Sequence, residues 1–319
     1  MDDPEAATAA SADELLEQVH AVRRELELRD ESPGGEWVES SARELAAGRT
    51  PGWYYPTSVG GGLAFYATRG PDAFGHVHVG SGPGAAERAR RLVETLLDHL
   101  PREIGTAAIG FTGLAVEEER SVLAALAARP GSTVIERMAM DRPLGPDDGA
   151  PVGGPPDGLS LVPIRAVALD ALAELDTRAF AQSVDALLVG SDVAHYRHVL
   201  TTLLDGQLGL FLDAASTALY RPDPPELVGA ILTTERSARR AVFVDFMVAP
   251  ERQRAGVGRF LLRWGLRALW ALGYERVRLW VSAANTPARR LYETSGFRTT
   301  ATASIYRWSR SAAQPQTSR

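Results

Sequence analysis

Two hydrophobic periods alternate along the second half of the chain. Apolar residues three and four positions apart predict helices at residues 168–180, 193–204 and 259–272. Short apolar runs between turn-forming residues predict strands at residues 159–164, 209–213, 226–235, 242–248 and 277–281, with a turn at 221–225. The order of one strand, two helices, three strands and then alternating helices and strands predicts an α/β fold.

A segment rich in proline and glycine divides the chain nearly in half. Residues 143–158 suit neither a helix nor the interior of a strand, and we interpret them as a linker. Before the linker, the pattern predicts strands at 74–79, 106–111 and 133–140, and helices at 12–28, 85–100 and 117–128. We therefore expect one domain at residues 1–142, a second at 159–310, and a disordered tail at 311–319.

Composition narrows the class of protein. A chain of 319 residues suits about two domains. A net charge of −6 argues against a nonspecific nucleic-acid partner and weakly favours a cationic small molecule or a basic peptide. The absence of cysteine excludes disulfides, zinc thiolates and an acyl-cysteine intermediate, and we expect no metal site. The start resembles no signal peptide and arginines interrupt the long apolar runs, which predicts a cytoplasmic protein without a membrane partner.

Residues 253–258 read Gln-Arg-Ala-Gly-Val-Gly, between a predicted strand and a predicted helix. Because Gly256 and Gly258 carry no side chain, the loop amides and the positive end of the helix can face a phosphate. Glycine also begins many helices for structural reasons alone, so this loop does not by itself define a ligand. A dinucleotide fingerprint is disfavoured because Leu261 stands where its third glycine belongs, and a Walker loop requires lysine, which the chain lacks.

A second motif begins at Asn285, the single asparagine of the chain. A composition that avoids both asparagine and lysine suggests that this residue has a specific role. From Asn285 the chain reads Asn-Thr-Pro-Ala-Arg-Arg-Leu-Tyr-Glu-Thr-Ser-Gly-Phe. The two segments together resemble the GNAT superfamily of N-acetyltransferases, whose signature is Gln/Arg-x-x-Gly-x-Gly/Ala followed by Asn-x-x-Ala-x-x-Leu-Tyr-x-x-x-Gly-Phe.

The resemblance implies two tandem GNAT-like domains, each a mixed, mostly antiparallel sheet flanked by helices. It covers residues 159–308 firmly, whereas the first half is similar to a degenerate copy of the same plan. In that copy Pro83 removes an amide from the loop Ser-Gly-Pro-Gly, and the asparagine and tyrosine of the second motif are missing. We therefore expect one coenzyme per chain, bound by the second domain.

For the site, the resemblance implies acetyl-CoA as co-substrate and Tyr292 as the general acid beside its sulfur. Asp245 interrupts an apolar strand and is our candidate general base; Glu235 is a weaker one. The alternatives are a core tyrosine at position 292 and an ion-paired or solvated carboxylate at position 245. The expected coenzyme-binding residues are Met247, Val248, Gln253, Arg254, Gly256, Val257, Gly258, Arg259 and Asn285, with Met247 and Val248 acting through their backbone groups.

These features predict an acetyl-CoA-dependent N-acetyltransferase that transfers the acetyl group directly to a primary amine of a small molecule or peptide. The acceptor is expected to enter between residues 180–198 and the region of Tyr306. The alternative is a non-catalytic acyl-CoA-binding sensor or scaffold, against which the presence of Tyr292 and Asn285 argues. We expect a monomer or a homodimer.

Overall fold

The computed structural model describes residues 19–20, 24, 52–55, 61–69, 71–80, 82–156, 158–181, 183–186, 193–206 and 209–310. Contacts divide the chain into a first unit, Met1–Glu136 with Ala303–Arg319, and a second unit, Arg137–Thr302. Most of the helix expected at 12–28 and all of the tail expected at 311–319 lie outside the described residues. No helix in the described part of the chain is long and apolar enough to cross a membrane.

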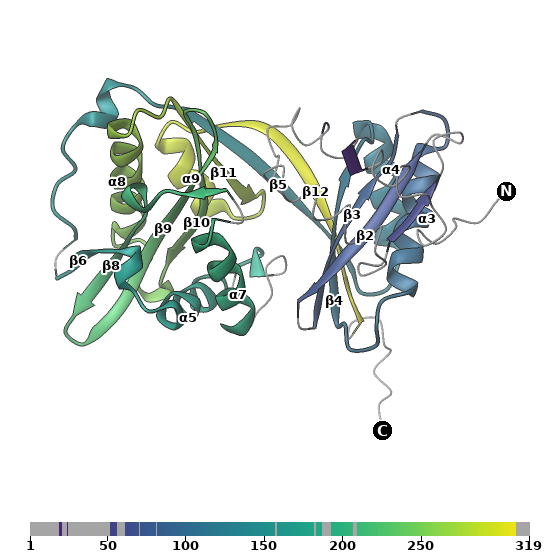
Figure 1. The fold of residues 1–319 in the computed structure, drawn as a ribbon, viewed down its shortest axis with the longest axis horizontal. Coiled ribbons are helices and arrows are strands. Elements are labelled where there is room, and N and C mark those ends of the chain that lie inside the picture. Colours follow the sequence, from purple (N-terminus) through teal and green to yellow (C-terminus); the bar gives the residue numbers. More distant parts are fainter. Residues whose placement is uncertain are drawn as a thin grey trace. The chain divides into compact units, whose positions relative to one another are not determined.

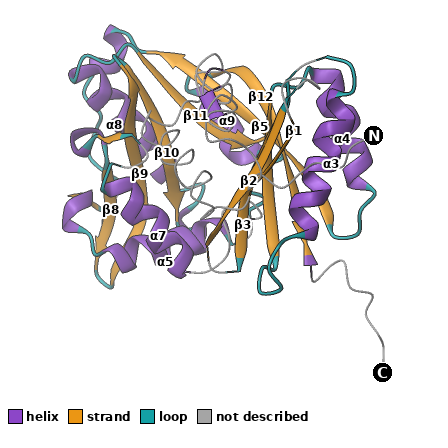
Figure 2. Ribbon diagram, turned by 45° about the vertical axis from the view of Figure 1, so that its right-hand side comes forward, coloured by secondary structure: helices purple, strands orange, loops and turns teal. Residues whose placement is uncertain are grey.

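The first unit is a sheet covered on one face by two helices (Figure 1). Its strands follow the order β1-β2-β3-β4-β12, and only β3 and β4 pair in parallel. They are β1 (Gly52–Tyr55), β2 (Gly62–Arg69), β3 (Asp72–His78), β4 (Thr106–Thr112) and the C-terminal part of β12 (Arg298–Ser309). The helices α3 (Ala85–Asp98) and α4 (Val116–Ala127) lie side by side over this sheet in Figure 2.

The core of the first unit lies between its sheet and these helices. Leu92 and Leu96 of α3 and Leu126 of α4 are buried in one cluster with Tyr306 and Trp308 of β12. The hydroxyl groups of Tyr306 and Ser132 are 2.5 Å apart. The Tyr306 side chain itself therefore cannot line a cleft, because strand β12 carries this residue into the core of the first unit, and the route by which the acceptor enters stays a prediction.

The second unit places helices on both faces of its sheet. Its strands follow the order β5-β11-β10-β9-β8-β6, and only β10 and β11 are parallel. They are β5 (Ser132–Pro143), β6 (Ser160–Pro163), β8 (Thr217–Pro222), β9 (Pro225–Ser237), β10 (Arg240–Val248) and β11 (Arg276–Ser282), and the short β7 (Leu210–Phe211) pairs with β9. The helices are α5 (Leu169–Phe180), α7 (Val193–Leu204), α8 (Val257–Ala271) and α9 (Thr286–Thr294).

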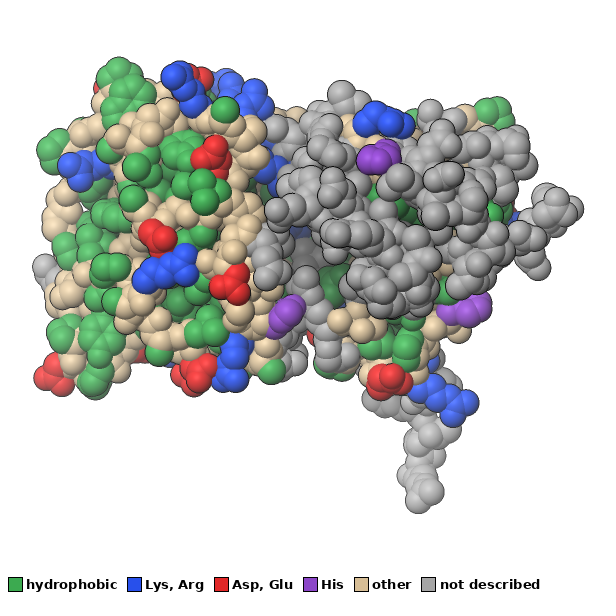
Figure 3. All heavy atoms as spheres, in the orientation of Figure 1, with side chains coloured by type: hydrophobic (Ala, Val, Ile, Leu, Met, Phe, Trp, Pro, Cys, Tyr) green, Lys and Arg blue, Asp and Glu red, His purple; other side chains and the backbone are tan. Residues whose placement is uncertain are grey.

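Side-chain alternation along β9 connects the sheet to two separate cores. Ile231 packs in the cluster that includes the buried face of α8, whereas Ala230 and Leu232 pack in the cluster formed with α5 and α7. This alternation is what period-two strands produce in a sheet buried on both faces. On the face shown in Figure 3, acidic and basic side chains are interspersed over the described surface of this unit. The predicted class, a mixed and mostly antiparallel sheet flanked by helices, is confirmed in both units.

Two strands carry the chain between the units. Residues 132–136 of β5 belong to the first unit, while residues 137–143 pair with residues 282–276 of β11 in the second. Conversely, residues 305–309 of β12 pair with residues 110–106 of β4 in the first unit. The sequence-based boundaries at residues 142 and 159 follow the proline-rich segment, whereas the compact units follow strand pairing and are therefore discontinuous in sequence.

The proline-rich segment 143–158 packs on the second unit rather than extending freely. It contains a short 3-10 helix, Pro146–Gly149, and the Leu144 amide donates to the Glu275 carbonyl at 2.9 Å. Leu144 and Val152 pack against the core cluster of α8. A side chain at Gly149 would lie 3.0 Å from the ring of Trp270, so glycine permits this close approach.

One predicted strand is misplaced. Residues 209–213 form only the two-residue β7 and the start of a 3-10 helix, and the strand paired along β9 is β8, at residues 217–222. Ser216 explains the shift, because its hydroxyl accepts a hydrogen bond from the Thr233 amide at 2.9 Å and fixes the chain where β8 begins. The turn predicted at 221–225 is confirmed, since β8 and β9 form a hairpin there with Pro222 opposite Pro225.

Candidate active site

A cleft of about 590 Å³ opens in the second unit where two parallel strands separate. β10 and β11 pair only from Arg240 opposite Arg276 to Phe243 opposite Leu279. Immediately after Phe243 the register of β10 against β9 shifts by one residue, which places a bulge at Val244. A bulge bends a strand and redirects the side chains that follow it. The carboxyl ends of β10 and β11 therefore form two walls of the cleft instead of a continuous ladder.

The loop before α8 forms another wall and has the backbone of an anion site. Gly256 has φ of 83° and Arg254 has φ of 62°, so the chain turns sharply just before the helix. Phe260 makes the first helical hydrogen bond, to the Gly256 carbonyl at 2.9 Å, and no side chain among the described residues caps this end. The amides of residues 257–259 are left for another acceptor, and the positive end of the helix favours an anion there.

Tyr292 of α9 lies in the same cleft. Its side chain is 6 % exposed, and its ring contacts Phe246 at 6.0 Å between centroids in an edge-on arrangement and Phe297 at 5.9 Å. Such aromatic pairs hold the ring in one orientation. The neighbouring rings therefore fix where the tyrosine hydroxyl can act.

Burial and charge keep Tyr292 protonated. Removal from water raises its pKa, the negative charges of Asp185 and Asp245 raise it further, and Arg137 opposes these effects only partly. At neutral pH the phenol is therefore a hydrogen-bond donor.

Asp185 lies at the centre of a hydrogen-bonded network beside Tyr292. Arg137 approaches its carboxylate at 2.6 Å, Asn285 donates to it at 2.9 Å, Ser183 donates at 3.1 Å, and Ser282 donates from the end of β11. The side chains of Arg137 and Asp185 are only 19 % and 9 % exposed. Burial lowers the pKa of Arg137 and the charge of Asp185 opposes that effect. The pair therefore joins strand β5 to the segment between α5 and α7.

Asn285 uses both ends of its amide. Its oxygen accepts from the Ala288 amide at 3.3 Å and caps α9, while its nitrogen binds Asp185. The specific role inferred for Asn285 is therefore at least structural. Its contact with a coenzyme stays a prediction.

Asp245 follows the bulge in β10 and is half-buried in the cleft. Its carboxyl group is hydrogen-bonded to that of Asp176, on α5, which is 1 % exposed. Burial raises the pKa of both groups, and for Asp176 the charge of Asp245 raises it further. The structure thus gives Asp245 a carboxylic acid as its hydrogen-bonding neighbour, and its role as a general base stays a prediction.

The cleft brings together most, but not all, of the predicted site residues. Those lining it are Tyr292, Asp245, Val248, Gln253, Arg254, Gly258 and Asn285. Met247 and Val257 are 0 % and 1 % exposed and pack in the cores, so their side chains are structural. Gly256 and Arg259 lie beside the loop but do not line the cleft. Glu235 is also absent from the lining, and it accepts a hydrogen bond from the Tyr274 hydroxyl at 2.8 Å.

Sequence reasoning did not single out four of the ionisable residues that line this cleft: Arg137, Asp176, Asp185 and Tyr196. Asp176 left a detectable signal, because it lies on the face of the helix formed by Leu172 and Leu175, where a charged residue is unusual. Arg137 left none, because local patterning does not reveal which sheet a strand will join.

Comparison with known proteins agrees with this architecture. Residues 179–297 match the model of the acetyltransferase (GNAT) family. The mycothiol acetyltransferase of Clavibacter sepedonicus is 32 % identical over 152 residues, which span 48 % of this chain and 47 % of that protein. The chain thus matches about half the length of this curated relative.

Solved structures extend the similarity to both units at the level of the fold. A GCN5-related N-acetyltransferase from Sphaerobacter thermophilus aligns over 98 % of this chain and 95 % of its own, with a TM-score of 0.61 and 15 % identity. A tandem GNAT protein from the clavulanic acid biosynthesis pathway aligns over 98 % of both chains, with a TM-score of 0.58 and 15 % identity.

The two units therefore share the fold of tandem GNAT proteins. Residues 179–297, which contain both the glycine-loop and the Asn-to-Phe motifs, are similar to the acetyltransferase (GNAT) family.

Proposed function

We propose that the protein is an acetyl-CoA-dependent N-acetyltransferase that transfers the acetyl group directly to a primary amine of a small molecule or peptide. The observation that carries the proposal is the convergence in one cleft of an uncapped helix N-terminus, a protonated Tyr292 and a half-buried Asp245. These are the three groups that thioester aminolysis needs: an anion cradle for the coenzyme, an acid and a base.

The cleft residues fit acetyl-CoA, which would supply an activated acetyl thioester. Gly258 borders the cleft, and a methyl group added at this glycine would lie 3.3 Å from Leu291 Cδ2, so a larger side chain would occupy the cradle. We assign the pyrophosphate to the loop of Gln253, Arg254, Gly256, Val257, Gly258 and Arg259. The backbone of Met247 and Val248 and the amide of Asn285 complete the coenzyme-binding residues that we propose.

Asp245 and Tyr292 have complementary proton roles in this proposal. An amine with a pKa of about 10.4 pays roughly 4–5 kcal/mol to be neutral at pH 7, so a nearby carboxylate that accepts its proton lowers the barrier. Tyr292 donates toward the departing sulfur. A thiol has a pKa of about 8.5, below that of tyrosine, and the raised pKa of Tyr292 increases the difference. Tyr292 therefore acts mainly by hydrogen bonding to the developing thiolate rather than by complete proton transfer.

The first unit lacks the features that make the second suitable for a coenzyme. Its parallel strands β3 and β4 stay paired to their ends, from Asp72 opposite Thr106 to His78 opposite Thr112, so they do not separate into a cleft. The guanidinium of Arg88 donates to the carbonyls of Gly61 and Gly80 at 3.3 and 3.0 Å, beside the start of α3. At the start of α3 the loop therefore presents carbonyl groups bound to the Arg88 guanidinium, whereas a phosphate would need free amide donors.

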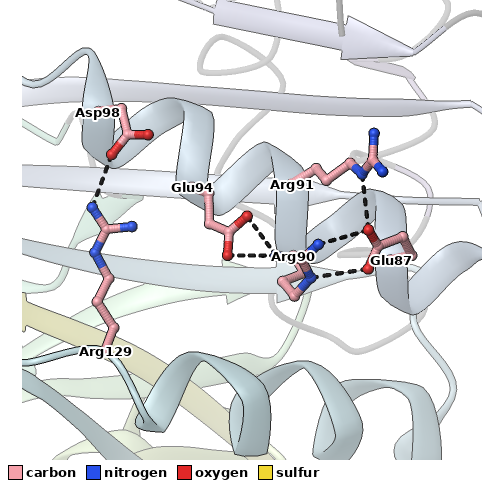
Figure 4. Close-up of polar contacts among 6 residues, drawn as sticks. All are labelled: Glu87, Arg90, Arg91, Glu94, Asp98 and Arg129. Atoms are coloured by element: carbon pink, nitrogen blue, oxygen red, sulfur yellow. Dashed lines mark hydrogen bonds and ion pairs between the residues drawn. The ribbon is translucent and has the colours of Figure 1, made fainter. Parts of the chain in front are cut away.

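The charged residues in the first turns of α3 and α8 also favour the second unit as the coenzyme site. Glu87 lies in the first turn of α3 and binds Arg90 and Arg91, part of the ion-pair row drawn in Figure 4. Its hydrogen bonds to these arginines lower the pKa of Glu87 to about 2, so it stays ionised. An acid already complements the dipole of α3, whereas the first turn of α8 contains no acid and includes Arg259. We propose one coenzyme per chain, bound by the second unit.

The test is release of coenzyme A from acetyl-CoA across a panel of primary amines. The protein has no cysteine, so a thiol reagent detects the product without background from the enzyme. The proposal predicts amine-dependent thiol release and a binding stoichiometry of one coenzyme per chain by calorimetry. Tight coenzyme binding without release for any amine would favour the non-catalytic sensor, and two coenzymes per chain would contradict the inactive first unit.

A further inference from the structure

Asp176 and Asp245 reach each other from opposite layers of the second unit. Asp176 lies on α5, which packs against β10, and Asp245 follows the bulge in that strand. Both line the cleft, and their carboxyl groups are hydrogen-bonded to each other. Two ionised carboxylates have no hydrogen to share and repel each other, so this contact requires one bound proton.

The surroundings place that proton on Asp176. This side chain is 1 % exposed, and its Oδ1 has no hydrogen-bond partner among the described residues, so a negative charge on it would be poorly stabilised. Asp245 is half-buried, faces the cleft and accepts a hydrogen bond from the Phe246 backbone amide. The charge is therefore better stabilised on Asp245.

The other groups around the pair do not change this assignment. Tyr196 of α7 is 2 % exposed, and burial together with the charges of Asp176, Asp245 and Asp185 raises its pKa, so it stays neutral. Arg137 and Arg254 are the cations that line the cleft, and Arg137 binds Asp185. Asp185 also faces Tyr196, and Tyr292 of α9 faces Asp245.

We propose that Asp176 is a positioning residue that keeps its proton, donates it in a hydrogen bond to Asp245, and so holds Asp245 ionised as the base that accepts the proton of the amine. This inference rests on the proposed function. In the step, an N–H bond of the ammonium breaks, an O–H bond forms on Asp245, and the nitrogen retains the electron pair. Attack of this nitrogen on the acetyl carbonyl then forms the C–N bond, the C–S bond breaks, and the departing thiolate takes up the second proton that the nitrogen loses. The proton leaves Asp245 for water in the cleft after the product departs.

Three variants test the proton assignment by its effect on the pH profile. Asp176→Leu removes the donor, so we expect kcat/KM to fall at least about tenfold and the acidic limb to move to higher pH, since the anion of Asp245 loses its hydrogen bond. Asp176→Asn restores a neutral donor and should recover most of that loss and return the limb toward its original position. Asp245→Asn should lower kcat by about a hundredfold or more. Glu174→Gln, at an exposed position of α5, is the matched control.

A loss in Asp176→Asn as large as that in Asp245→Asn would overturn the proposal, because it would make ionised Asp176 the base. An unmoved acidic limb in Asp176→Leu would overturn it as well. Thermal unfolding checks that each variant is folded.

A stability measurement gives a second test that does not depend on activity. A carboxyl group whose pKa is raised by folding binds its proton more tightly in the folded state, so stability falls as pH rises above about 3.9 and through the raised value. Asp176→Asn has no such proton to lose. Its melting temperature should therefore rise relative to the unmodified protein as pH increases from about 4 to about 8. A constant difference across this range would contradict the shared proton, whereas a failure of acetyl transfer with every amine would contradict only the proposed function.

Discussion

Single side chains in the cleft have roles that their types alone do not reveal. Asn285 illustrates this, because one end of its amide caps α9 and the other binds Asp185. The cap satisfies a backbone donor that would otherwise be unpaired, and the second bond fixes the segment that carries Asp185.

Replacing Asn285 by alanine should lower the free energy of unfolding by about 1–2 kcal/mol, the usual cost of losing a helix cap together with a buried hydrogen bond. Urea unfolding followed by circular dichroism measures the change. Asn285→Ser, which keeps a capping oxygen but cannot reach Asp185 in the same way, should lose less. Unchanged stability in the alanine variant would mean that neither bond contributes.

The variant Tyr292→Phe tests whether the hydroxyl group of this residue contributes to turnover. The variant should keep its affinity for acetyl-CoA and lose about a hundredfold in turnover, the usual size of general acid catalysis. Because burial raises the pKa of Tyr292, loss of its proton should not produce a basic limb below about pH 10 in the unmodified enzyme. Stopped-assay rates from pH 6 to pH 10 would check both points. Wild-type turnover in the variant would return Tyr292 to a core role.

At the scale of elements, two helices begin with the same glycine geometry and differ in what surrounds them. Gly256 before α8 has φ of 83° and Gly84 before α3 has φ of 79°. In both cases glycine permits the positive φ that the turn before the helix requires. Of these two helices, only α8 begins where the adjacent strands separate and has no acid in its first turn. The turn alone therefore does not show which helix binds the coenzyme.

This pair of glycines provides a matched experiment. Gly256→Ala forces an L-residue into the left-handed region, at a cost of about 1–2 kcal/mol if the loop keeps its shape, and the loop should shift to relieve it. We expect acetyl-CoA affinity to fall at least about tenfold, or roughly 1.4 kcal/mol. Gly84→Ala introduces the same backbone strain in the first unit and should leave affinity unchanged. Calorimetry that finds equal affinities for both variants would exclude the α8 loop as the phosphate cradle.

The elements were predictable from the sequence where local patterning determines them. The helices α5, α7 and α8 and the strands β10 and β11 follow the apolar periods closely, and the glycine loop located the cleft. The partners of β5 and β12 were not predictable, because an alternating strand pattern specifies a strand but not the sheet it joins. For this reason the sequence did not indicate that Arg137 lines the cleft or that Tyr306 belongs to the core of the first unit.

For the molecule as a whole, β5 and β12 each contribute residues to both units, so we expect that the second unit cannot be separated at the proline-rich segment. A fragment beginning at residue 159 lacks Met140, which is fully buried in the α8 core, and Asp141, whose carboxylate pairs with Arg278 at 2.6 Å. It also lacks Arg137, the partner of Asp185. The edge of β11 would be left unpaired.

The fragment of residues 159–310 should therefore be aggregation-prone and should not bind acetyl-CoA. A full-length chain cleaved by an engineered protease site within residues 150–156 is the matched control, because it contains every strand and lacks only the covalent link. We expect the cleaved protein to keep its melting temperature within a few degrees and to retain coenzyme binding. A soluble 159–310 fragment with the affinity of the whole chain would show that β5 is dispensable.

Because β5 and β12 each contribute to both units, they also determine the order in which the two units of a newly made chain can finish folding. The strand that the second unit takes from the first half, residues 137–143, leaves the ribosome before the rest of that unit, so its sheet can grow on a strand already present. The first unit, in contrast, receives its last strand only after the second unit has been synthesised. Its β4 edge and the core positions of Tyr306 and Trp308 stay open until residues 303–309 are synthesised, which happens only after the whole second unit has been made. Premature termination before residue 303 would thus leave the first unit unable to close, although most of it is made before the second.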